Sequence, residues 1–271
     1  MPRSTRVTIL LADMSEEPLG DEGCSFDGGA VDPRTRRRRA AAPAASASDL
    51  HELALDLNTG VRSTVAANPR TSIELLETLA RDRSEWVRGS VATNERCPAA
   101  LAALLSSDAS WFVRSRVARF SPLSPSTAMR LARDPQIDVI RALADNPSLP
   151  RAAEGLLASH SDERVLEALA LNPGVSDATL SQLLPALAPH GRRQVAQRAG
   201  LSSVAIDLLA SDGDPWVRAT LAARSALPGE IQLALAGDPD IHVRTAIHAN
   251  AETSDEVRAI AAILGVTQGE D

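Results

Sequence analysis

The residues able to do acid–base, nucleophilic or metal chemistry are scattered through this sequence. The 271-residue chain has no Gly-rich phosphate loop, no G-x-S-x-G elbow and no H-E-x-x-H motif. Its five histidines lie apart, and even His242 and His248 are separated by six positions, a spacing that places them poorly for one helix face. We therefore predict a protein that is not an enzyme, with no catalytic residue, no cofactor and no metal site.

The two cysteines, Cys24 and Cys97, lie in unrelated contexts, so we expect neither a disulfide framework nor a metal cluster. No stretch reaches the roughly 18 apolar residues that span a bilayer. These features predict a cytoplasmic protein that does not enter a membrane. All 28 basic residues are arginine and alanine is abundant, as in proteins from GC-rich genomes, which favours a bacterial source.

A column of arginines recurs along the chain, and a stripe of guanidinium groups could track phosphates. The charge balance argues against that use. The formal net charge is −7, and all of it falls after residue 48, where the chain has 21 arginines and 28 acidic residues. A nucleic-acid interface normally needs a basic face. An aspartate also lies six positions before most of these arginines. The two columns are Arg62, Arg88, Arg114, Arg192, Arg218 and Arg244, and Asp56, Asp82, Asp108, Asp212 and Asp238.

The few aromatic residues are phased with the arginines. Aromatic residues make up only 2% of the chain, yet Trp86, Phe112 and Trp216 share the column two positions before an arginine, and His242 holds that column in another unit. Trp111 is adjacent. Two interpretations stay open: the rings fill space between units of an otherwise aliphatic core, or they are exposed anchors for a partner.

These columns belong to an internal repeat. The skeleton D-x4-V-R-x2-V-A-x-N returns every 26 residues, and eight registers fit without insertion or deletion. A period between 20 and 50 residues is typical of a solenoid, whose units each contact only their neighbours.

Each unit is predicted to hold two short helices. Asn-Pro at Asn68-Pro69, Asn146-Pro147 and Asn172-Pro173 ends the first helix, because the residue before proline is pushed out of helical geometry. A column of Ser or Pro then opens the second helix. That helix carries a leucine column, which we assign to the core: Leu79, Leu105, Leu131, Leu157, Leu183, Leu209 and Leu235.

The motif V-R-x2-V-A-x-N-P, followed by a Ser or Pro start and L-x3-L-A-x-D, resembles the leucine-rich repeat variant family, a relative of HEAT-type repeats. The resemblance covers Asp49 to about Leu264. It implies an all-α, right-handed solenoid of about eight 26-residue units, in which α-helices alternate with shorter 3₁₀-like helices or with further α-helices. Some members bear an N-terminal cysteine-rich iron–sulfur segment, but here Cys24 is the only cysteine before the array.

The resemblance also implies a role for the charged columns. In HEAT-type repeats, Asp and Arg at such positions form a ladder in which carboxylate and guanidinium groups bond between adjacent units. Taking each aspartate with the arginine six residues later, we expect the pattern to fail at three successive junctions: Asp134 with Ile140, His160 with Leu166, and Ala186 with Arg192. This stretch is either a hinge or a segment where apolar contacts replace the ladder.

We therefore expect a disordered arm at residues 1–48, whose Arg36 to Arg39 run is solvated, a repeat array at residues 49–264 and a polar tail at residues 265–271. The predicted function is a protein-interaction scaffold that binds a protein partner, with Trp86, Trp111, Phe112, Trp216 and His242 as candidate contacts. The alternative is a HEAT-like nucleic-acid-binding or DNA-glycosylase-like protein.

Overall fold

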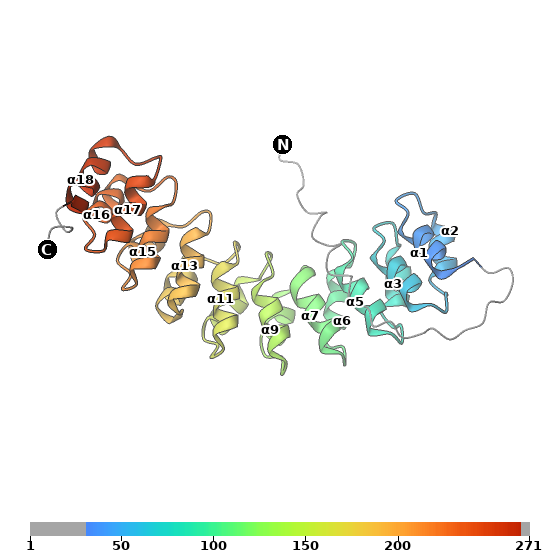
Figure 1. Cartoon of the computed structure of the whole chain (residues 1–271). Helices are drawn as coiled ribbons and strands as arrows, with labels where there is room; N and C mark the ends of the chain where they lie inside the picture. Colours follow the sequence, from blue (N-terminus) through green and yellow to red (C-terminus); the bar gives the residue numbers. More distant parts are fainter. Residues whose placement is uncertain (1–30, 267–271) are drawn as a thin grey trace.

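The computed structural model describes residues 31–266 and shows an elongated, curved array of short helices (Figure 1). The helix α1 lies at one end and α18 at the other. Within the described residues the chain forms eighteen α-helices, one 3₁₀-helix and no strand. The predicted all-α solenoid is confirmed, with nine helix pairs where about eight units were expected.

The helices form two rows, because each unit contributes one helix to each row. The first row consists of α1 (Pro33–Ala41), α3 (Thr59–Ala67), α5 (Glu85–Thr93), α7 (Trp111–Phe120), α9 (Ile137–Ala144), α11 (Glu163–Leu171), α13 (Pro189–Gln197), α15 (Pro215–Ala222) and α17 (Ile241–Ala249). The second row consists of α2 (Ala47–Leu53), α4 (Ile73–Leu79), α6 (Ala99–Leu105), α8 (Pro125–Leu131), α10 (Arg151–Ala158), α12 (Asp177–Leu183), α14 (Ser203–Ala210), α16 (Gly229–Ala236) and α18 (Asp255–Val266).

Both rows are α-helical. The one 3₁₀-helix in the described chain, η1 (Leu184–Ala186), follows α12 directly. Second-row helices begin at the predicted Ser or Pro column: the Ser72 hydroxyl accepts the Leu75 N–H, and Pro98 holds the equivalent N-cap position of α6. Helices of seven to ten residues are marginal alone, so their stability comes from stacking.

The core runs along the array between the two rows. Most first-row helices bury a pair of apolar residues one turn apart, such as Val87 and Val91 of α5, both with no exposed surface. The predicted leucine column faces them, and Leu131 and Leu209 are fully buried. Each buried valine or leucine contributes about 1.5–3 kcal/mol, and neighbouring units share the gain.

The prediction that the first 48 residues form a disordered arm is wrong for residues 33–48. Helix α1 is capped by Asp32, which accepts the N–H groups of Arg34 and Thr35, and α1 packs on α2 and α3. Ala40 is fully buried. The run Arg36 to Arg39, which we expected to be solvated, lies in the middle of α1, and residues 1–30 lie outside the described chain.

The C-terminal end differs from the other units. Helix α18 has twelve residues where earlier second-row helices have seven or eight. It includes positions 265 and 266, which we had assigned to the tail; the rest of that segment lies outside the described residues. Ile263 is 64% exposed, because no later unit covers this face within the described chain.

Candidate interaction surface

Six arginine–aspartate pairs link successive units. In each pair the guanidinium donates Nε–H and Nη2–H bonds to the carboxylate of the residue 20 positions later, so each arginine reaches into the next unit. The pairs, with their Nε to Oδ2 distances, are Arg36–Asp56 (2.5 Å), Arg62–Asp82 (2.7 Å), Arg88–Asp108 (2.7 Å), Arg114–Asp134 (2.7 Å), Arg192–Asp212 (2.6 Å) and Arg218–Asp238 (2.7 Å).

These bonds join adjacent units, as the resemblance implies, but the aspartate is not the one six residues before the arginine with which we had paired it. Arg88 donates its Nη1–H to the backbone carbonyl of Asp82 at 2.8 Å, whereas the Asp82 carboxylate binds Arg62. The side chain six residues back is therefore not the ionic partner. The error arose because the two columns recur with one period, so the spacings of 6 and 20 residues are equally regular in the sequence.

Each ladder aspartate also shapes the turn before the next helix. One oxygen of Asp108 accepts the Ser110 N–H at 2.9 Å while both oxygens accept from Arg88. Burial of Asp108 raises its pKa, but the Arg88 and Ser110 hydrogen bonds outweigh burial, so the net pKa lies below the usual value of 3.8. The pair is closed, bidentate and mostly removed from water.

Two interior junctions lack the ion pair, not three. Asp134 binds Arg114 and Arg192 binds Asp212, so the gaps lie only where Ile140 would meet His160 and Leu166 would meet Ala186. Ile140 and Leu166 are both buried. Apolar packing therefore occupies the arginine positions at these junctions, and flexibility of this segment stays a prediction.

A second ladder was missed by the sequence analysis, which used its asparagines only as helix stops. The Asn94 amide donates to the Ala66 and Asn68 carbonyls of the preceding unit at 2.7 and 2.9 Å, and its Oδ1 accepts the Arg96 N–H. The 28-residue and 26-residue separations repeat at Asn172. Arginine replaces asparagine at Arg198 and Arg224, where Nη1 reaches the equivalent carbonyls.

Aromatic residues of α5 and α7 form a partly exposed group in which the Trp86 and Phe112 rings meet at a tilt of 56°. The rings of Trp86 and Phe112 lie 4.6 Å apart, and the Arg116 guanidinium lies over Phe112 at 5.2 Å and over Phe120 at 5.7 Å. Trp86 is 40% exposed and Trp111, the first residue of α7, is 48% exposed. We call Trp86, Trp111, Phe112, Arg116 and Phe120 the aromatic cluster.

Gly89 allows this cluster to form. A Cβ atom at position 89 would lie 2.8 Å from Cε1 of Phe112, closer than van der Waals contact permits. Glycine on α5 therefore lets the Phe112 ring lie against the helix backbone.

A second, smaller cluster lies on α15 and α17. The rings of Trp216 and His242 are 4.6 Å apart, and Nδ1 of His242 lies 3.1 Å from Asp240. Trp216 is 52% exposed. The five candidate contacts thus fall into two groups separated along the first row by α9, α11 and α13 (Figure 1). Both interpretations hold for Trp86 and Trp216, because each ring contacts a ring of the neighbouring unit and still keeps 40% and 52% of its surface exposed, respectively.

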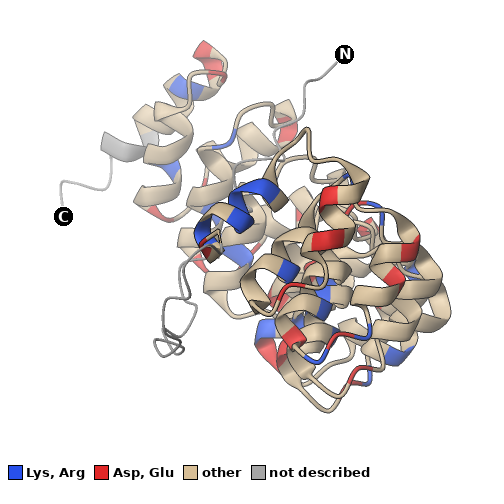
Figure 2. Cartoon of the chain, turned by 90° about the vertical axis from the view of Figure 1, so that its right-hand side faces the viewer, with Lys and Arg blue, Asp and Glu red and all other residues tan. Residues whose placement is uncertain are grey.

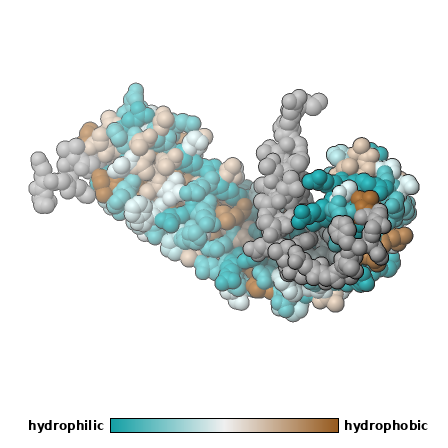
Figure 3. Space-filling model, turned by 45° about the vertical axis from the view of Figure 1, so that its right-hand side comes forward, coloured by the Kyte–Doolittle hydropathy of each residue, from teal (hydrophilic) through white to brown (hydrophobic). Residues whose placement is uncertain are grey.

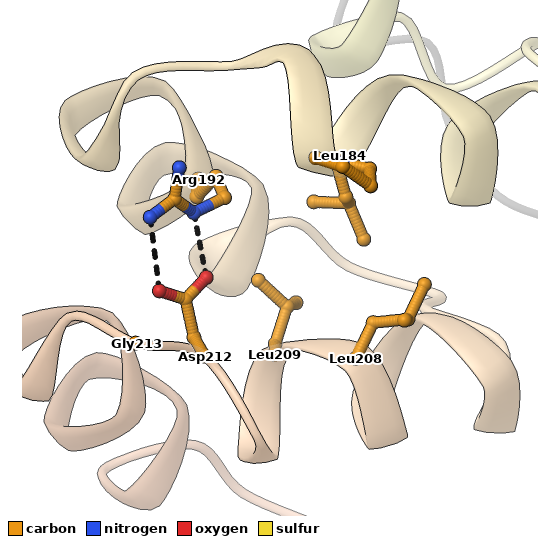
Figure 4. A pocket seen from close by; sticks show the side chains of 7 residues that line it. Leu184, Arg192, Leu208, Leu209, Asp212 and Gly213 are labelled. Atoms are coloured by element: carbon orange, nitrogen blue, oxygen red, sulfur yellow. Dashed lines mark hydrogen bonds and ion pairs between the residues drawn. The ribbon is translucent and has the colours of Figure 1, made fainter.

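A small cavity of about 270 Å³ lies where η1 interrupts the regular stacking. Leu184 faces Leu208 and Leu209 across it, and the Arg192–Asp212 pair closes one side (Figure 4). The polar groups nearest to it are already bonded to each other, so the cavity offers no free charge to a ligand.

Charge of both signs is interspersed over the array (Figure 2). Among the described residues, no three His, Cys, Asp or Glu side chains gather as a metal site, and none of the described helices has the length and apolar character of a membrane span. Burial raises the pKa of the Cys97 thiol to about 11, which leaves it unreactive near neutral pH.

Comparison with known proteins agrees with the predicted resemblance. A model of the leucine rich repeat variant family matches residues 59–84, one unit of the array. A solved structure described as a leucine-rich repeat variant with a novel repetitive protein structural motif has a TM-score of 0.52 with this chain. It is 24% identical, and the match covers 80% of this chain and 82% of that one, so the likeness concerns the fold. No curated protein matches the sequence.

Proposed function

We propose that this protein is a non-enzymatic scaffold whose first-row helices bind a protein partner through the aromatic cluster. The observation that carries the proposal is the contact of Trp86 with Phe112 and of Phe112 with Arg116 across two units, with Trp86 left 40% exposed. Tryptophan and arginine dominate the energetics of protein interfaces. Trp216 and His242 form a second contact point on the same row.

The cluster is held in place before a partner arrives. Its rings are supported by neighbouring helices, by the close approach at Gly89 and by the Arg88–Asp108 pair that joins α5 to the following unit. A preorganised surface loses less conformational entropy on binding. The face of the array seen in Figure 3 is mostly hydrophilic, with scattered apolar residues. This supports the aromatic cluster, rather than a broad apolar band, as the anchor for the partner.

The ladder arginines are already paired with aspartates, which favours a protein partner rather than a nucleic acid. Five of the six arginines in the predicted stripe give their Nε and Nη2 donors to aspartates, so these groups would have to leave a carboxylate before binding a phosphate. The net charge of −7 adds repulsion. We also propose a location in the bacterial cytoplasm, in keeping with the buried Cys97 thiol, which forms no disulfide among the described residues.

Affinity capture from nuclease-treated extract of the source cells tests the proposal. The full chain is compared with a Trp86→Ala/Trp111→Ala variant and with Leu104→Ala, which removes an equally exposed apolar residue from second-row α6. We expect a protein retained by the full chain and by Leu104→Ala to be lost from the double variant. Retention by all three proteins would contradict the proposal.

A gel shift with duplex DNA tests the alternative. Binding that weakens steeply with salt would favour the nucleic-acid interpretation, because phosphate contacts release counterions. The scaffold proposal predicts no shift.

A further inference from the structure

Among the described residues, one ladder arginine has no carboxylate partner. In α17, Arg244 repeats the anchoring of the others: its Nη1 donates to the carbonyls of Asp238 and Pro239 at 2.7 and 2.9 Å. Its Nε and Nη2, which hold the aspartate in the six pairs, are buried and have no hydrogen-bond partner among the described residues. Arg244 is also only 2% exposed, and the structure places it among the most buried large side chains.

The missing acceptor follows from the end of the array. The residue 20 positions after Arg244 is Leu264, where six of the eight earlier units have aspartate. In those units the second-row helix ends before the ladder position, as α4 ends at Leu79 ahead of Asp82. Helix α18 instead continues to Val266, so its backbone is still helical at the ladder position.

An unpaired buried guanidinium is costly, because desolvation of the charge is not offset by a counter-ion. Its two Nη1 bonds hold the Arg244 side chain in the ladder geometry, so its Nε and Nη2 donors keep the planar fork that binds two oxygens in the six pairs. Carboxylate matches such a fork in a bidentate manner. The six pairs show that this array uses the same fork for a carboxylate and for no other group.

We propose that the Nε and Nη2 groups of Arg244 form a carboxylate-binding site that completes the ladder at the C-terminal end of the array. The site is separate from the aromatic cluster and does not depend on the scaffold proposal. Two sources share the required chemistry. One is Glu270 or Asp271, which follow α18 in the sequence and lie outside the described residues. The other is an acidic side chain of another molecule.

A second copy of this chain, stacked end to end on the first, does not supply the external carboxylate at the ladder position. The residue that would carry the carboxylate at the start of its array, 26 positions before Asp56, is Ala30. The external ligand is therefore an aspartate or glutamate of a different protein.

Nuclear magnetic resonance of the full chain labelled with ¹⁵N-arginine tests the site. The Nε–H signals of Arg244 and of the occupied control Arg218 are assigned from their loss in Arg244→Lys and Arg218→Lys. Exchange with water is then measured in the unmodified chain, in Glu270→Gln/Asp271→Asn, and during titration with sodium acetate at constant ionic strength. Acetate is the probe because it reproduces the aspartate side chain.

If the chain supplies the carboxylate, the double substitution speeds Arg244 Nε–H exchange about ten-fold or more, as expected for loss of a charge-assisted hydrogen bond. If the ligand is external, acetate shifts the Arg244 signal saturably and slows its exchange. The Arg218 signal stays unchanged in both cases. An Arg244 signal that responds to neither change overturns the proposal.

Discussion

Replacing Arg88 by methionine tests the ladder at the junction between α5 and the following unit. The change keeps most of the apolar stem and removes three hydrogen bonds: two to the Asp108 carboxylate, at 2.7 and 2.8 Å, and one to the Asp82 carbonyl, at 2.8 Å. Asp108 then keeps only the Ser110 N–H bond. Its side chain is 9% exposed in the folded protein, so water cannot readily replace the lost donors.

The expected cost combines a lost ion pair with an uncompensated carboxylate. Breaking a fully buried pair costs about 3–5 kcal/mol, and hydrogen bonds to charged groups contribute about 1.5–3 kcal/mol. Because the Arg88 side chain keeps 17% of its surface exposed, we expect Arg88→Met to lower the free energy of unfolding by about 2–4 kcal/mol.

Double-mutant cycles in urea, followed by circular dichroism, separate pairing from general destabilisation. The cycle of Arg88→Met with Asp108→Asn should give a coupling energy of about 1.5–3 kcal/mol. The control cycle pairs Arg88→Met with Asp82→Asn, which changes a side chain bound to Arg62 and leaves the Asp82 carbonyl in place. Its coupling should stay within about 0.5 kcal/mol. Additivity in the first cycle, or stronger coupling in the second, would refute pairing between units.

Three further predictions follow from the described contacts. Asp82 and Asp108 have folded pKa values below the usual 3.8, so the stability that they contribute is present above that pH and is lost as pH falls further. The urea concentration at the unfolding midpoint should therefore decrease as the pH is lowered below about 4. The decrease should be less steep in Arg62→Met/Arg88→Met, which lacks both pairs. In a Cys24→Ser background, native Cys97 should resist a thiol reagent at about pH 8 and react fully in urea, and rapid native reaction would contradict its burial. Deleting residues 1–48 should destabilise the array relative to a chain starting at residue 31, because Asp56 loses Arg36 and Asn68 loses the Ala40 carbonyl; equal unfolding midpoints would argue against this packing of α1.

The period of the sequence predicted most of the fold, because each unit repeats the same apolar and capping residues. The first unit was missed for a physical reason. Thr35 and Arg39 hold the positions of the Val61–Val65 pair, so α1 lacks the usual apolar signature. Two signals did remain: Asp32-Pro33 matches the cap and first residue of α15, and Arg36 lies 26 positions before Arg62.

The candidate site was less predictable, because a regular period does not show which side chains of neighbouring units are in contact. Side chains 6 and 20 residues apart recur equally often, so only the stacking of units shows that Arg88 binds Asp108. The exposure of Trp86 and Trp111 likewise depends on how far adjacent first-row helices cover each ring. The asparagine ladder could not be predicted, because its acceptors are backbone carbonyls, which every residue has.

Site-specific photo-crosslinking in the source cells tests the binding role of the aromatic cluster most directly. A benzophenone side chain replaces Trp111 on α7 in one protein and Leu104 on α6 in the other; the two positions are 48% and 52% exposed. The account predicts a discrete crosslinked protein from position 111 that is absent from position 104. The same protein crosslinked from both positions, or crosslinks to nucleic acid from position 111, would contradict it.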